Sequence, residues 1–120
     1  MIRFTIPGPA VPKGRPRVTR TGHAYTPQRT KAYAEKVQWV AKAFAPRTHL
    51  SGPVSVQIVE YRKGTPEARP DIDNVLKNLL DAMNGLIWQD DSQVVWFFAE
   101  KRYDPKSPRV EVEVEEVEPA

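Results

Sequence analysis

The stretch from Arg69 to Gly85 reads RPDIDNVLKNLLDAMNG, and it decides the fold of the chain. Its apolar residues recur at steps of three and four, which predicts a helix with one buried stripe. The stripe consists of Ile72, Val75, Leu76, Leu79, Leu80 and Met83. The glycine that follows favours a left-handed end of the helix. The opposite face, with Asp73, Lys77 and Asp81, is therefore expected to face solvent.

Outward from this helix, the pattern predicts strands on both sides and one earlier helix. Alternating apolar residues predict strands over 2–6, 54–61 and 110–114. Residues 94–99 are apolar enough for a strand that is buried on both faces. Apolar residues at helical spacing predict a helix over 27–45. The order β-α-β-α-β-β indicates a small α/β domain, an α+β two-layer sandwich with two helices packed on one face of a mixed sheet.

The segment over about 7–27 is irregular, rich in proline and glycine, and basic. Its cations have no acid among them, and they are Lys13, Arg15, Arg17 and Arg20. We expect a mobile basic arm whose cations suit the phosphates of a polyanion such as nucleic acid.

Composition excludes several classes of protein. The 120 residues suit a single domain over 1–120. Cysteine is absent, which excludes a disulfide framework, a thiolate nucleophile and a cysteine-type zinc site. His23 and His49 have no acidic ligands beside them, so catalysis is expected to depend on aspartate, glutamate and lysine, without an organic cofactor. The chain has no long apolar run and no signal-like leader, so we expect a cytoplasmic protein that does not bind membranes.

The net charge of +3 conceals an asymmetry between the two parts of the chain. Residues 1–50 hold 10 Lys and Arg against Glu35 alone, and residues 51–120 hold 8 against 14 acids, which gives +9 and −6. A basic half suits nucleic acid, and clustered aspartates suit divalent cations. Ordinary surface charge explains the same numbers, so composition alone leaves both readings open.

The aspartates around the central helix are the candidate site. Inside a regular helix, Asp71 and Asp73 would point about 200° apart. If Asp71 is the last extended residue and Asp73 lies in the first turn, both carboxylates can face the mouth of the loop, with Lys77 one turn further on. The turn at Asp90 and Asp91 could return across the sheet and supply a third carboxylate. Such oxygen ligands suit Mg²⁺ and a phosphodiesterase site, with Lys77 placed to hold phosphate charge.

Each of these residues also has a purely structural explanation. Asp71 can cap the helix, and Asp73 can complement its dipole. Asp90 and Asp91 are common turn residues, and Lys77 can pair with a neighbouring acid on a solvated face. On spacing alone, a DNA-binding module without catalysis therefore remains an alternative.

The same residues resemble the signature of the RusA family of Holliday junction resolvases. The run 69–85 carries the resemblance together with the sequence DDSQV at 90–94. The start of this chain, over 6–9 and 13–17, is also similar to the start of family members. The resemblance covers nearly the whole chain. It implies a metal-dependent crossover junction endodeoxyribonuclease of DNA recombination and repair, often carried by phages or prophages, which acts as a homodimer on four-way DNA junctions.

Carried over by residue, the resemblance implies that Asp71, Asp73 and Asp91 are the catalytic acids that bind Mg²⁺, with Mn²⁺ as a substitute. It implies that Lys77 is the essential lysine and that Arg69 contacts DNA. Asp90 is the alternative to Asp91 as the third ligand. A general branched-DNA or flap nuclease remains open as an alternative activity. The strands over 94–99 and 110–114 are candidates for the dimer interface as well as for the core.

Overall fold

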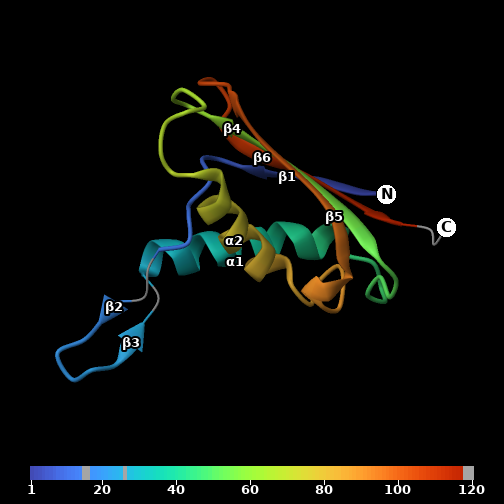
Figure 1. The fold of residues 1–120 in the computed structure, drawn as a ribbon, viewed down its shortest axis with the longest axis horizontal. Coiled ribbons are helices and arrows are strands. Elements are labelled where there is room, and N and C mark those ends of the chain that lie inside the picture. Colours follow the sequence, from blue (N-terminus) through green and yellow to red (C-terminus); the bar gives the residue numbers. More distant parts are fainter. Residues whose placement is uncertain (15–16, 26, 118–120) are drawn as a thin grey trace.

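The computed structural model describes residues 1–14, 17–25 and 27–117, and of Arg17 only the backbone (Figure 1). Its elements in chain order are β1 (Ile2–Pro7), β2 (Arg17–Val18), β3 (Ala24–Tyr25), α1 (Gln28–Phe44), β4 (Val54–Arg62), α2 (Ile72–Met83), the 3₁₀ turn η1 (Asp91–Gln93), β5 (Val94–Tyr103) and β6 (Arg109–Glu116). No helix within these ranges is long and apolar enough to cross a membrane.

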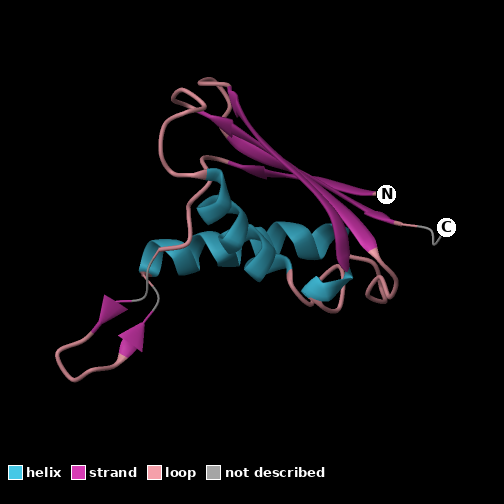
Figure 2. Cartoon of the chain, viewed as in Figure 1, coloured by secondary structure: helices cyan, strands magenta, loops and turns pink. Residues whose placement is uncertain are grey.

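Four of the strands form one mixed sheet in the order β1-β6-β4-β5. β4 and β5 run parallel, and the other neighbours are antiparallel. Both long helices lie on the same face of the sheet (Figure 2), with α1 against β1 and α2 against β5. The predicted fold class is therefore confirmed.

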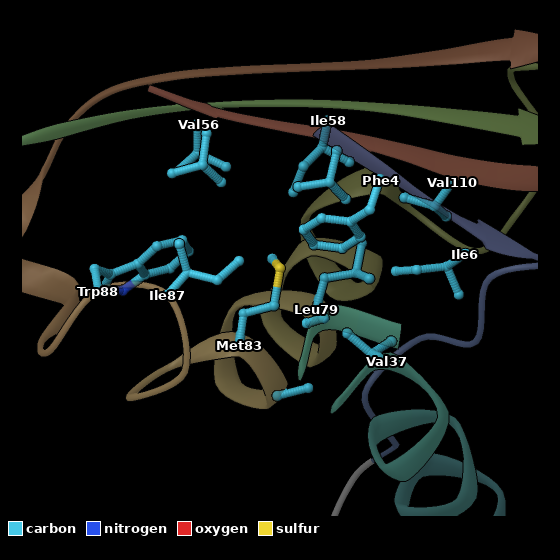
Figure 3. Close-up of a cluster of buried hydrophobic side chains, with 14 of the residues drawn as sticks. Phe4, Ile6, Val37, Val56, Ile58, Leu79, Met83, Ile87, Trp88 and Val110 are labelled. Carbon is cyan, nitrogen blue, oxygen red and sulfur yellow. The ribbon is translucent and has the colours of Figure 1, made fainter. Parts of the chain in front are cut away.

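The core lies between the sheet and the helices (Figure 3). Strand residues at alternate positions meet the inner faces of α1 and α2, and the labelled side chains there are Phe4, Ile6, Val37, Val56, Ile58, Leu79, Met83, Ile87, Trp88 and Val110. In the predicted α2 stripe, Val75, Leu79 and Met83 are fully buried, and the other members flank them. The helix ends as predicted, because Gly85 adopts φ +80°, a conformation that costs glycine little.

β5 corrects the prediction of a strand buried on both faces. Val95, Trp96, Phe97 and Phe98 are between 38% and 61% exposed. The reason is topological, because both helices cover the same face of the sheet and leave the other face open, and β5, as the last strand, has a neighbour on one side only. Periodicity cannot distinguish a central strand from an apolar strand at an edge.

The basic segment divides into two parts. Its first part is held against the body of the protein, since Gly8 N–H donates to the carbonyl of Pro108, and Lys13 N–H donates to that of Asn74. Gly14 lies so close to α1 that a Cβ there would be 2.9 Å from Pro27 Cγ. The second part contains the β2–β3 hairpin, which the sequence did not predict and which projects away from the body in Figure 1.

Candidate active site

The N-terminal end of α2 meets the condition under which the carboxylates of Asp71 and Asp73 can both face the loop. Asp71 precedes the helix in an extended conformation, with φ −66° and ψ 147°, and Asp73 lies in the first turn. The carboxylate of Asp71 makes no capping hydrogen bond, so the alternative explanation of this residue as a helix cap does not apply. Arg69 places its guanidinium 3.9 Å from the carboxylate of Asp71, and both side chains are exposed. Asp71 is therefore open to a ligand from solvent.

A buried ion pair fixes the chain just before Asp71. The guanidinium of Arg62 donates to both carboxylate oxygens of Glu60, at 2.8 and 2.9 Å. It also donates to the carbonyls of Ala68 and Pro70. Both charged side chains are almost completely buried. Because one guanidinium joins the end of β4 to the following loop, the backbone that leads into Asp71 is held in place.

Glu60 and Arg62 were not predicted as site residues, although the sequence carries a signal for them. They continue the even-numbered positions of β4, whose earlier members Val54, Val56 and Ile58 face the core. Two opposite charges on the core face of a strand predict a buried ion pair.

The cations that the sequence predicts as site residues lie in different parts of the structure. Lys77 is exposed on α2, one turn beyond Asp73. Lys13 forms an ion pair with Asp81 at 2.6 Å, with both side chains about half exposed. Arg20 is exposed in the turn of the β2–β3 hairpin. Arg15 lies outside the described residues.

At the other end of α2, Asp90 and Asp91 have different tasks. The carboxylate of Asp90 caps η1 by accepting from Ser92 N–H at 3.1 Å, and hydrogen bonds from Ser92 hold the pKa of Asp90 below its ordinary value. Asp91 instead accepts from the indole Nε1–H of Trp88 at 3.0 Å. Trp88 is fully buried, so it fixes the exposed Asp91 carboxylate from within the core. Asp90 therefore stabilises the turn, whereas the Asp91 carboxylate is oriented by a core side chain.

The two ends are far apart within one chain. The 12 residues of α2 span about 18 Å. η1 lies at the start of β5, at the opposite end of α2 from the N-terminal end (Figure 1), and Asp71 directly precedes that N-terminal end. Over the described residues, no three acidic or histidine side chains gather into a group that could hold a metal ion. The expectation that the Asp90–Asp91 turn returns to Asp71 and Asp73 is therefore wrong for a single chain, because β5 must start at the far end to run parallel to β4.

Comparison with known sequences decides the class of enzyme. The family model described as endodeoxyribonuclease RusA matches residues 7–115. The chain belongs to the RusA family. The resemblance seen in the sequence is thus confirmed, and so is the prediction of an enzyme, an endodeoxyribonuclease.

Two relatives resemble this RusA-family chain at different lengths. The crossover junction endodeoxyribonuclease of Lactococcus phage r1t is 51% identical over 51 residues, which cover 42% of this chain and 38% of the phage protein. The uncharacterized protein YqaN of Bacillus subtilis (strain 168) is 38% identical over 138 aligned residues, which cover 97% of this chain and 96% of YqaN.

Proposed function

We propose that this RusA-family enzyme resolves four-way DNA junctions in recombination and repair by paired, Mg²⁺-dependent phosphodiester hydrolysis, as a two-fold dimer. Family membership and the name of the phage relative support the substrate. The observation that carries the dimer is the apolar edge strand β5, at the side of the sheet where α2 packs.

The free edge of β5 suits a second copy of the same strand. Trp96 and Phe98 are stacked on the face away from the helices, with ring centroids 6.3 Å apart, and Phe97 is partly exposed on the other face. An exposed apolar edge attracts another strand, and large apolar patches mark protein interfaces. A contact between two identical strands closes a two-fold dimer, the commonest oligomer of soluble proteins.

Such a dimer also brings the acids together. If two β5 strands pair antiparallel, the start of one lies beside the end of the other. Asp91 of the second copy then approaches the end of the sheet where Asp71 and Asp73 stand. Each dimer would contain two identical sites, each built from both copies, and this suits the near two-fold symmetry of a four-way junction.

The side chains fit a hard divalent cation. Asp71, Asp73 and Asp91 offer exposed carboxylate oxygens, the ligands that Mg²⁺ prefers and that Mn²⁺ shares. When bound, such an ion supplies an activated water and charge stabilisation for phosphodiester hydrolysis. Lys77, one turn beyond Asp73 on the exposed face of α2, would hold phosphate charge. Arg69 and the basic residues before α1 would bind the DNA backbone.

Mixing two inactive variants tests the composite site. Neither Asp73→Asn nor Asp91→Asn protein alone should cleave. A mixed dimer has one site with both lesions and one site with none, so nicking of a four-way junction should return to about a quarter of the wild-type level after full subunit exchange. Paired resolution should stay absent. Mixing Asp71→Asn with Asp73→Asn is the matched control. Because each site takes both of these aspartates from the same copy, every site of the mixed dimer carries a lesion, and activity should stay absent.

If the acids of each site came from one chain, the first mixture would be as inactive as the control. A panel of a four-way junction, a fork and a duplex, each with and without Mg²⁺, tests the substrate. Equal cleavage of all three would instead indicate a general nuclease.

A further inference from the structure

A small cavity opens beside the N-terminal end of α2. Its volume is about 230 Å³, and the end of β4, the β4–α2 loop and the start of α1 form its walls. The charged residues in the lining are Arg29, Glu60, Arg62, Lys63 and Arg69. The cavity is smaller than a typical site for an organic ligand, so it suits a small polar group.

The charges of the lining do not cancel. Glu60 and Arg62 neutralise each other in the wall, and two of the three remaining N–H donors of Arg62 are used by backbone carbonyls. Arg29, Lys63 and Arg69 add three positive charges, and within the described chain Arg29 and Lys63 form no ion pair. A cavity with fixed walls and surplus positive charge favours an anion.

The cavity adjoins the acids of the proposed site. Arg69 and Pro70 line it, and Asp71 is the next residue in the chain. A DNA strand carries one phosphate for about every 3.4 Å along the helix axis. A strand whose scissile phosphate lies at Asp71 therefore carries a neighbouring phosphate within reach of the cavity.

We propose that this cavity is a subsite for a DNA phosphate next to the one that is cleaved, with Arg29 and Lys63 as its ligand-binding cations. The inference rests on the proposed function for the identity of the scissile strand. The buried Glu60–Arg62 pair forms part of the wall of the subsite and adds no net charge to it. The cationic cavity and the adjacent acids together would orient a phosphodiester between a site for an anion and a site for a cation.

Salt dependence of junction binding tests the two cations. Affinity for a four-way junction is measured without divalent cation at several salt concentrations, for wild type, Arg29→Gln and Lys63→Gln. Each variant should bind more weakly, and the slope of log Kd against log salt should fall by about one unit for each lost phosphate contact. Lys42→Gln is the matched control, because Lys42 is exposed in the last turn of α1, far from the cavity, and its loss changes net charge equally.

The slope of Lys42→Gln should stay near that of wild type. If the cavity variants and Lys42→Gln change the slope equally, the effect is one of overall charge, and the subsite is wrong. Cleavage of the junction by wild type is measured separately with Mg²⁺. Its absence would overturn the proposed function but would leave the binding comparison valid.

Uncharged phosphates locate the subsite on the DNA. Junctions that carry one methylphosphonate at successive positions around the incision point are bound to wild type and to the Arg29→Gln, Lys63→Gln double variant. At one position beside the scissile phosphate, the methylphosphonate should weaken junction binding by wild type. It should have no further effect on binding by the double variant, because the contact with that phosphate is already lost. If the losses of affinity from the methylphosphonate and from the double variant add at every position, the proposal is contradicted. If free inorganic phosphate competes for binding but no methylphosphonate position shows this coupling, the cavity is a site for the free ion.

Discussion

The two ends of α2 present their acids in opposite ways. At the N-terminal end, Asp71 makes no capping hydrogen bond, and Asp73 stands in the first turn. At the C-terminal end, Asp90 caps η1, and Asp91 accepts a hydrogen bond from Trp88. All four aspartates are exposed, so exposure does not separate structural acids from functional ones. Their hydrogen bonds do differ, because Asp90 accepts from both the backbone and the hydroxyl of Ser92, whereas the carboxylate of Asp91, among the residues that the structure describes, accepts only the indole N–H of Trp88. A carboxylate that accepts one hydrogen bond keeps lone pairs for a cation.

The largest expected effect is that of Asp73→Asn. We predict a loss of junction cleavage of at least about a thousandfold, because the amide keeps the shape of the side chain and removes a charge that the cation requires. The melting temperature should hardly change. Single-turnover cleavage and thermal unfolding measure the two effects. Asp81→Asn, on the same helix face, is the control and should cleave within about threefold of wild type. Retention of a tenth of the activity by Asp73→Asn would contradict the site.

Substitutions that prevent two β5 strands from pairing should leave Asp91 far from Asp71 and Asp73. Trp96→Lys combined with Phe98→Lys places charge on the exposed β5 edge, where it repels a second strand. We predict a monomer in sedimentation and a loss of cleavage of at least about a hundredfold, since neither site would be complete. Thr5→Lys on the opposite edge strand, β1, is the control and should stay dimeric. A double variant that remains dimeric and active would exclude β5 as the interface.

Local properties of the chain could be predicted from the sequence. The α2 stripe and its glycine end depend on residues three or four apart, so periodicity was sufficient for them. The extended conformation of Asp71 and the place of Asp73 in the first turn are equally local, and the sequence could name them as the condition for a shared site.

Properties that depend on the direction or neighbours of a strand could not be predicted. Asp91 lies far from Asp71 because β5 runs parallel to β4, which no local pattern encodes. The exposure of β5 follows from its place at the edge of the sheet and from the face that no helix covers. An apolar strand has the same sequence whether its neighbour belongs to its own chain or to another. The pairing of Glu60 with Arg62 was within reach, because their alternation with core residues was visible.

A smaller effect is expected for Trp88→Phe, which removes the donor to Asp91 and keeps an aromatic ring in the core. We predict that the Mg²⁺ concentration for half-maximal cleavage rises about tenfold, because residues that orient a metal ligand typically act on affinity for the metal. The maximal rate should recover at high Mg²⁺. Ile87→Val is the control, since Ile87 is equally buried and donates no side-chain hydrogen bond. If both variants shift the Mg²⁺ midpoint equally, the effect of Trp88 is one of packing alone.

The smallest effect is expected for Asp90→Asn, and it depends on pH. Hydrogen bonds from Ser92 hold the pKa of Asp90 below its ordinary value, which is about 4. A carboxylate with a lowered pKa in the folded state stabilises the fold above its unfolded pKa, and this contribution disappears as the pH falls through the folded value. Asparagine is also a good cap, so the substitution isolates the charge. Wild type should therefore melt slightly above Asp90→Asn at neutral pH, and the difference should shrink steadily below about pH 4. At neutral pH, Asp90→Asn should cleave within about twofold of wild type, since Asp91 and not Asp90 is the proposed ligand. A difference in melting temperature that persists in strong acid would contradict the role of the charge, and a cleavage loss as large as that of Asp91→Asn would make Asp90 the third ligand.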